Sequence, residues 1–388
     1  MSLTSAQGFR AAGVAAGIKA SGEPDLALVV NDGPLDAAAA VFTANRVVAA
    51  PVTWSRQAVA DGRLRAVVLN SGGANACTGP GGFADTHRTA EYAAKALGDA
   101  AADVGAGDIA ICSTGLIGER LPMPAVLHGV DLAAQALSDS GGPAAADAIR
   151  TTDTVSKQAV WQSGGWTVGG MAKGAGMLAP GLATMLCVLT TDAVVDAPTL
   201  HTALAAATRV TFDRVDTDGC MSTNDTVLVL ASGASGVSPA PGELATALRT
   251  VCADLAAQLI ADAEGATKQI RIDVVGAASE DDAVEVGRSV ARSTLLKCAL
   301  FGNDPNWGRV LAAVGTTSAL FEPDELDVAI NGVQVCRRGA AGEPRDAVDL
   351  SGREVTIGID LHAGEQSATI WTTDLSHAYV EENSAYSS

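Results

Sequence analysis

The sequence has 388 residues and a formal net charge of −19 at pH 7, from 44 acidic and 25 basic side chains. This acidic surplus argues against a nucleic-acid-binding or anionic-membrane-binding surface, where clustered Lys and Arg are expected. Of the residues, 48% are hydrophobic but only 4% are aromatic, and 42 are glycine, which suits a closely packed α/β interior of small side chains. The length allows two or three domains or one large body.

The first two thirds of the chain alternate apolar runs with helical patterns. Apolar runs predict strands over residues 26–30, 66–69, 109–112, 185–189, 227–230 and 270–275. Between Glu243 and Glu264 the apolar residues recur every three or four positions, which predicts a helix that stops near Gly265. The mixture indicates an α/β fold whose topology stays open.

Two further patterns follow towards the C-terminus. Ser279 and Asp282 have the spacing of a capped helix start. Residues 355–361 alternate between apolar and polar, and a short glycine-containing turn joins them to residues 367–371. We therefore predict a β-hairpin at this end of the chain.

The cysteines and histidines give no sign of a metal or a disulfide framework. The seven cysteines are widely spaced without a Cys-x-x-Cys pair, and the five histidines lack metal-ligand spacing. No secretion signal is recognised, and a reducing, cytoplasmic location is expected. The longest uncharged run, 174–191, contains Pro180 and Gly181, so we expect a loop and a buried strand rather than a membrane span.

The stretch from Lys173 to Asp192 places a loop rich in glycine and proline before Thr184, at the head of an apolar strand. A threonine hydroxyl is too weakly acidic to attack an amide unaided. Cleavage before Thr184 would free an α-amine with a pKa of roughly 7.7–8.0, which can serve as base for its own side chain. A threonine that merely begins a buried strand is the alternative.

The segment around this threonine resembles the processing site of the ornithine acetyltransferases, the bifunctional glutamate N-acetyltransferases of arginine biosynthesis, which cleave themselves at an Ala-Thr bond. Ala183 and Thr184 stand in that place. Further segments resemble the family in the same order, at residues 8–19, 70–79, 113–118, 222–226, 262–268, 302–309 and 379–383. The resemblance implies two interleaved chains, 1–183 and 184–388, in a layered α/β sandwich with the logic of N-terminal-nucleophile hydrolases.

The resemblance also implies site residues by position. Thr114 and Gly115 match the oxyanion-stabilising pair, in a Ser-Thr-Gly turn that offers a hydroxyl and backbone N–H groups. The implied substrate contacts are Thr151 or Thr152, Lys173, Thr184, Glu264, Asn383 and the terminal Ser388, where the family often has threonine.

The implied reaction moves the acetyl group of N2-acetylornithine through Thr184 to glutamate, without a metal or organic cofactor. Whether acetyl-CoA is also a donor stays open, and so does the number of chain pairs beyond the heterotetramer that the family implies. Two other readings remain: a self-processing aminopeptidase or amidase, and a non-catalytic protein that binds a small molecule.

Overall fold

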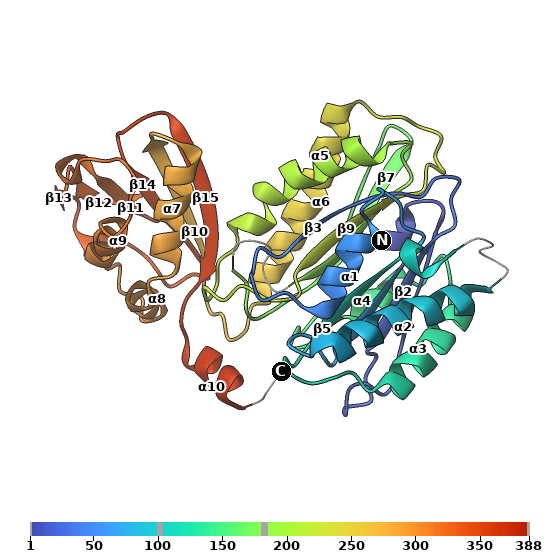
Figure 1. Ribbon diagram of the computed structural model, residues 1–388. Coiled ribbons are helices and arrows are strands. Elements are labelled where there is room, and N and C mark those ends of the chain that lie inside the picture. Colours follow the sequence, from blue (N-terminus) through green and yellow to red (C-terminus); the bar gives the residue numbers. More distant parts are fainter. Residues whose placement is uncertain (1, 99–103, 180–184, 386–388) are drawn as a thin grey trace.

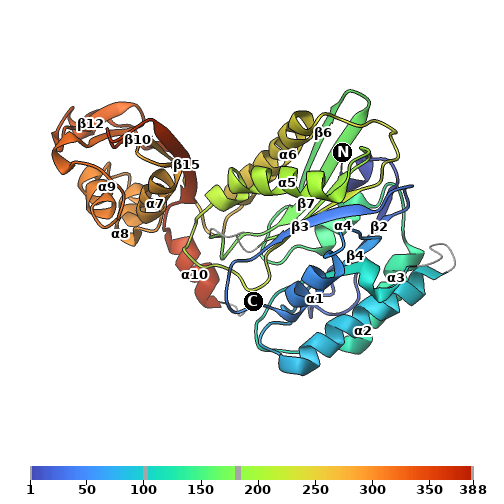
Figure 2. The same ribbon diagram turned by 45° about the horizontal axis from the view of Figure 1, so that its top comes forward.

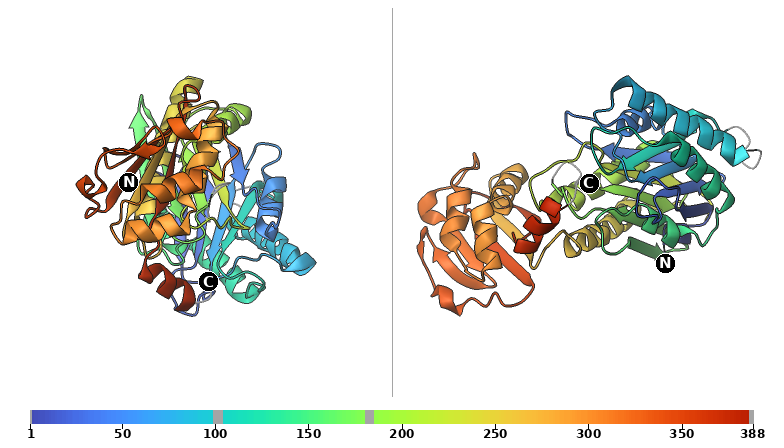
Figure 3. Two further views of the ribbon diagram at one scale, coloured as in Figure 1. Left: turned by 90° about the vertical axis from the view of Figure 1, so that its left-hand side faces the viewer. Right: turned by 90° about the horizontal axis from the view of Figure 1, so that it is seen from below.

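The computed structural model describes residues 2–98, 104–179 and 185–385, which form a larger and a smaller body (Figure 1). The views in Figures 2 and 3 show that the smaller body stands to one side of the larger one and that helix α10 lies near their junction.

The larger body contains two sheets. The first has the order β1-β2-β4-β5, with β1 (Phe9–Val14), β2 (Leu26–Asn31), β4 (Ala66–Ser71) and β5 (Ile109–Thr114). The second has the order β3-β9-β8-β7-β6, with β3 (Ala37–Phe42), β6 (Lys157–Ser163), β7 (Trp166–Lys173), β8 (Leu186–Thr191) and β9 (Thr226–Ala231). The helices are α1 (Ala50–Ala58), α2 (Gly79–Leu97), α3 (Met123–Gln135), α4 (Gly142–Ala148), α5 (Ala197–Arg209) and α6 (Pro241–Ala261).

The smaller body is built on one sheet of order β13-β12-β11-β14-β10-β15. Its strands are β10 (Gln269–Ala277), β11 (Asp327–Ile330), β12 (Val333–Arg337), β13 (Ala340–Ala341), β14 (Glu354–Asp360) and β15 (Gln366–Thr373). The helices of this part are α7 (Glu280–Ala291), α8 (Thr294–Phe301), α9 (Trp307–Val314) and, after β15, α10 (His377–Ala385).

The larger body is a sandwich of four layers, helices, sheet, sheet and helices, with an apolar core between each pair of neighbouring layers. One core lies between the two sheets and includes Val67 of β4 and Val188 of β8. A second packs α2 and α3 on the outer face of the first sheet, and a third packs α5 and α6 on the outer face of the second. Strands β2, β4, β5, β8 and β9 are buried along their whole length, which explains their continuous apolar runs. The predicted layered α/β fold is confirmed.

Most of the predicted elements are present. The six predicted strands correspond to β2, β4, β5, β8, β9 and β10. Ser279 caps α7, since its hydroxyl accepts the backbone N–H of Asp282 at 3.1 Å. The predicted hairpin is wrong: β10 lies between β14 and β15, parallel to the first and antiparallel to the second.

Among the described residues, α6 alone is long and apolar enough to cross a membrane by length and composition. Half of its apolar window is buried, and the helix packs against α5, β6 and β7. These contacts are those of a core helix.

The strand order brings the ends of several strands together at one edge of the second sheet. Lys173, the last residue of β7, pairs with Leu186 at the start of β8, and Leu186 pairs with Thr226 at the start of β9. The end of β5 adjoins β8 from the other sheet. This edge carries most of the predicted site residues.

Candidate active site

The turn that ends β5 holds Thr114 and Gly115 in a fixed position. The backbone N–H groups of Gly72 and Gly73 donate to the Thr114 carbonyl at 2.9 and 3.0 Å. Gly115 has a φ of +132°, and a Cβ at this position would lie 2.5 Å from Gly73 N. Only glycine therefore fits without moving the backbone. A rigid turn that presents a hydroxyl and an N–H group meets the requirement of an oxyanion site.

Lys173 connects this turn to the head of β8. Its ammonium group donates to Thr114 Oγ1 at 3.4 Å, and its backbone lies beside Leu186, two residues after Thr184 in the sequence. The side chain is buried rather than solvated. Burial lowers the pKa of Lys173, and the carboxylate of Asp153 opposes that shift.

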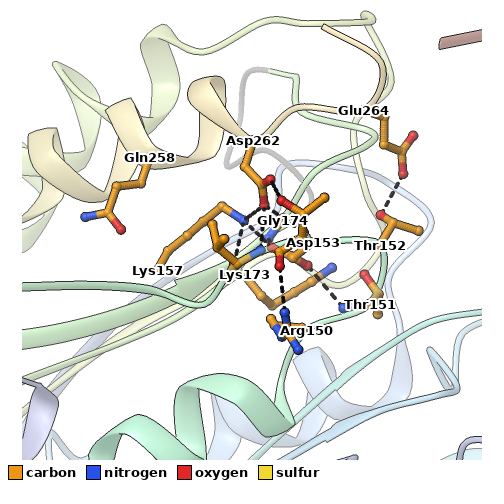
Figure 4. Close-up of polar contacts among 12 residues, drawn as sticks. Arg150, Thr151, Thr152, Asp153, Lys157, Lys173, Gly174, Gln258, Asp262 and Glu264 are labelled. Carbon is orange, nitrogen blue, oxygen red and sulfur yellow. Dashed lines mark hydrogen bonds and ion pairs between the residues drawn. The ribbon is translucent and has the colours of Figure 1, made fainter. Parts of the chain in front are cut away.

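A cluster of buried charges that sequence reasoning did not single out lies next to Lys173 (Figure 4). Lys157 is 0% exposed and donates to Asp153 and Asp262, each at 2.6 Å. Asp153 also accepts the Gly174 N–H at 2.7 Å. Burial favours a higher pKa for Asp153, but Lys173, Lys157 and the Gly174 bond hold it at about 2. The cluster fixes the end of β7 to the end of α6.

Glu264 lies in the loop after α6. The sequence pattern predicts that this helix extends to Glu264, but it ends at Ala261. Its Oε1 accepts the Thr152 hydroxyl at 2.6 Å, and its Oε2 accepts Asn383 Nδ2 at 3.0 Å. The Glu264 N–H donates to Ala175 O at 3.0 Å, and a Cβ at Gly176 would lie 2.5 Å from Oε2. The loop that follows β7 therefore rests against this carboxylate.

The two neighbouring threonines play different structural parts. The Thr152 hydroxyl meets Glu264, whereas the backbone N–H of Thr151 donates to Asp153 Oδ2 at 3.1 Å (Figure 4). Ala183, Thr184 and Ser388 lie outside the described residues. The predicted residues that the structure brings to this edge are Thr114, Gly115, Thr151, Thr152, Lys173, Glu264 and Asn383.

A cleft of about 540 Å³ opens beside Glu264. Thr152, Asp262, Arg353 and Glu382 also line it, with Glu382 contributed by α10. The sequence analysis did not single out Arg353 or Glu382. Nothing in the local sequence of Arg353 indicates a site, whereas Glu382 lies in the family-like segment 379–383, beside the predicted contact Asn383. A small cleft with several carboxylates suits a ligand that carries an ammonium group.

A second cavity, of about 290 Å³, lies between α6 and the sheet of the smaller body, lined by Ala256, Arg271, Glu354 and Trp371 among others. It is lined by none of the predicted site residues in the described part of the chain. The chemistry is therefore argued from the cleft beside Glu264.

Known proteins resemble this chain over its whole length. A protein from Streptomyces avermitilis named arginine biosynthesis bifunctional protein ArgJ is 66% identical over 388 residues, covering 100% of both chains. The protein of the same name from Mycobacterium tuberculosis is 59% identical over 389 residues, covering 100% of this chain and 96% of its own.

Among solved structures, ornithine acetyltransferase from Mycobacterium tuberculosis complexed with ornithine is 60% identical to this chain, with a TM-score of 0.46. The match covers 48% of this chain and 96% of that one. ArgJ from Bacillus halodurans is 34% identical with a TM-score of 0.48, covering 51% and 98%. The model of the ArgJ family matches residues 10–388. With this match and relatives that are 66% identical along their full length, the chain belongs to the ArgJ family.

Proposed function

We propose that this chain cleaves itself before Thr184 and then carries an acetyl group from N2-acetylornithine to glutamate on the Thr184 hydroxyl. As a member of the ArgJ family, the chain is an acyltransferase of arginine biosynthesis. The proposal concerns the route of the acetyl group and the residues that handle it. The observation that carries it is the contact between Lys173 and Thr114 beside the head of β8.

The new α-amine of Thr184 would act as the base. It accepts the proton of the Thr184 hydroxyl as the oxygen attacks the acetyl carbon, and it donates that proton to the departing amine of ornithine. Lys173 is the cation that the described structure holds next to the start of β8. A positive charge there disfavours protonation of the amine and so keeps it basic at neutral pH.

Thr114 and Gly115 would stabilise the oxyanion that forms in each half of the reaction. The two bonds from Gly72 and Gly73 to the Thr114 carbonyl leave the turn little freedom to reorganise. Donors that are fixed before the reaction contribute more than donors that must be ordered during it. This support applies equally to self-cleavage and to acetyl transfer.

The cleft beside Glu264 would receive the substrate. The carboxylates of Glu264 and Glu382 offer partners for the ammonium group of ornithine. Lys173 offers a partner for a substrate carboxylate, and Thr152 and Asn383 hold Glu264 in place. We retain Thr151 and the terminal Ser388 as further contacts.

The second sheet supports interleaved chains after cleavage. Strands β6, β7 and β3 precede residue 184, whereas β8 and β9 follow it, and the five are hydrogen-bonded in one sheet. A break before Thr184 therefore leaves 1–183 and 184–388 paired along β7 and β8. We extend the proposal to a heterotetramer of two such pairs and to acetyl-CoA as a second donor.

We also propose a cytoplasmic location. All seven cysteines lie in the described part of the chain and are free thiols, as expected in a reducing compartment.

Intact mass and an acetyl-transfer assay test the proposal together. The purified protein should appear as two fragments divided between residues 183 and 184, and it should transfer acetyl groups only when glutamate is present. Thr184→Ala should remain a single chain without transfer. The matched control is Thr191→Ala at the other end of β8, whose hydroxyl donates to Thr167 O at 2.8 Å, and it should be cut normally. An uncut, active wild-type protein would refute the proposal, and hydrolysis that outpaces transfer would favour an amidase.

A further inference from the structure

The segment before β9 contacts both the turn that holds Thr114 and the residue that follows Thr184. Asn224 is buried, and its Nδ2 donates to Ala74 O at 2.6 Å and to Ser113 O at 2.8 Å. It therefore holds the residue before Thr114. The next residue, Asp225, points its carboxylate at the backbone of Met185, directly before β8.

Asp225 is 0% exposed, and its two carboxylate oxygens differ. Oδ1 accepts the Met185 N–H at 3.1 Å. Oδ2 is buried and accepts no hydrogen bond of good geometry from the described residues, although the Ser222 side chain lies near enough to favour the ionised carboxylate. A buried carboxylate oxygen without a donor is costly, and native proteins rarely keep one without a role.

Covalent geometry limits how far Asp225 can be from the cleavage chemistry. Met185 N is bonded to the carbonyl carbon of Thr184, so the α-nitrogen of Thr184 is three bonds from an atom that Asp225 contacts. Standard bond lengths keep these two nitrogens within roughly 4 Å of each other in any backbone conformation. Asp225 Oδ1 therefore lies 3.1 Å from Met185 N, and Met185 N lies within roughly 4 Å of the nitrogen whose bond to Ala183 must break.

Self-cleavage lacks the base that the mature enzyme has. Before the break, the Thr184 nitrogen is an amide and cannot accept the hydroxyl proton, so another group must do so. Among the described charged groups, Lys173 and Asp213 act on Asp225. Burial disfavours the ionised form and raises the pKa of Asp225 well above its ordinary value, and Asp213 adds to this shift. The Met185 N–H, the Ser222 side chain and Lys173 on the neighbouring β7 oppose it by stabilising the ionised carboxylate.

We propose that Asp225 is the proton carrier of self-cleavage, an inference that rests on the proposed role of Thr184. The Asp225 carboxylate takes the proton from the Thr184 hydroxyl as the oxygen bonds to the Ala183 carbonyl carbon. It returns that proton to the Thr184 nitrogen as the C–N bond breaks, which leaves an ester and a free amine. Water then hydrolyses the ester and restores the hydroxyl.

The test follows the cleavage of precursor made in a cell-free system, with samples quenched over time and separated on a denaturing gel. Asp225→Asn keeps the shape and an acceptor for Met185 N–H but removes the base, and it should slow cleavage about 100-fold or more. The control is Asp192→Asn at the far end of β8, since this buried carboxylate accepts backbone N–H groups with both oxygens, from Thr167 at 2.7 Å and Gln7 at 3.0 Å. It should be cut at the wild-type rate.

The pH profile separates a proton carrier from a structural residue. The ionised carboxylate is the active form, so the wild-type rate should fall as pH drops through the raised pKa of Asp225. Asp225→Asn should lose this acid limb. If Asp225→Asn fails to fold by circular dichroism, the wild-type profile decides alone, and a rate that stays level down to acid unfolding overturns the inference.

The outcomes distinguish this inference from the proposed function. If the wild-type chain is never cut, Thr184 is not released and the proposed function fails. If the wild type is cut and Asp225→Asn is cut equally fast, only the role of Asp225 is overturned.

Discussion

Replacing Lys157 by methionine should destabilise the larger body strongly. The Lys157 side chain is 0% exposed, and those of its partners Asp153 and Asp262 are 1% and 9% exposed. Methionine fills much of the space of the lysine stem but leaves two buried carboxylates without their shared cation. Removing one partner of a buried ion pair costs about 3–5 kcal/mol, a large part of the 5–15 kcal/mol that stabilises a typical protein.

Urea unfolding, followed by far-ultraviolet circular dichroism, measures this loss. The control is Arg63→Met, which breaks a pair with Asp36 in which the arginine side chain is 60% exposed, and it should change the unfolding midpoint little. Adding Asp262→Asn to Lys157→Met removes one of the stranded charges and should recover part of the loss. Equal midpoints for Lys157→Met and Arg63→Met would refute the reasoning.

Three further predictions concern acid stability and the two sides of the site. The pKa of Asp153 falls from 3.8 to about 2 in the folded protein, so its contribution of about 2.5 kcal/mol is present above pH 3.8 and is lost as pH falls through 2; Asp153→Asn should flatten that part of the acid-unfolding curve. Thr114→Val should lower kcat, measured per cleaved chain, about 100- to 1,000-fold and should slow self-cleavage as well, while the thermal midpoint stays near wild type; an unchanged kcat would remove Thr114 from the oxyanion site. Asn383→Ala removes the 3.0 Å bond to Glu264 and should raise KM for acetylornithine about tenfold, which steady-state kinetics would measure.

The sequence predicts the buried strands well because their signal is local. Strands β4, β5, β8 and β9 are covered on both faces, so each appears as an unbroken apolar run. The partner of a strand has no such local signal. β14 and β15 are neighbours in sequence and look like a hairpin, but β10 inserts between them from far earlier in the chain.

The site residues likewise fall into those that a local sequence pattern indicates and those that only the fold reveals. Thr114, Lys173 and Glu264 stand in recognisable segments, and the structure brings them to one edge. Lys157 and Asp262 are 105 residues apart in sequence and form an ion pair that no local pattern indicates. The orphan oxygen of Asp225 is likewise visible only when the start of β9 is seen beside the start of β8.

The smaller body explains how the C-terminal end of the chain reaches the cleft. It has its own apolar core. The chain after β15 is held to the loop after α6 by polar contacts. Asp374 accepts the backbone N–H groups of Thr267 and Lys268, both at 2.9 Å, and the Ser376 hydroxyl donates to Gly265 O at 2.5 Å. These bonds fix the start of α10 on the loop that carries Glu264.

This attachment decides which residues of α10 can face the cleft. Asn383 lies about two turns along the helix and meets Glu264, and Glu382 lines the same cleft. Truncation after Thr373 would remove both side chains while leaving the apolar cores of both bodies complete. Such a truncated protein should therefore fold and lose affinity for acetylornithine; if it binds acetylornithine as tightly as the full chain, α10 has no part in the substrate site.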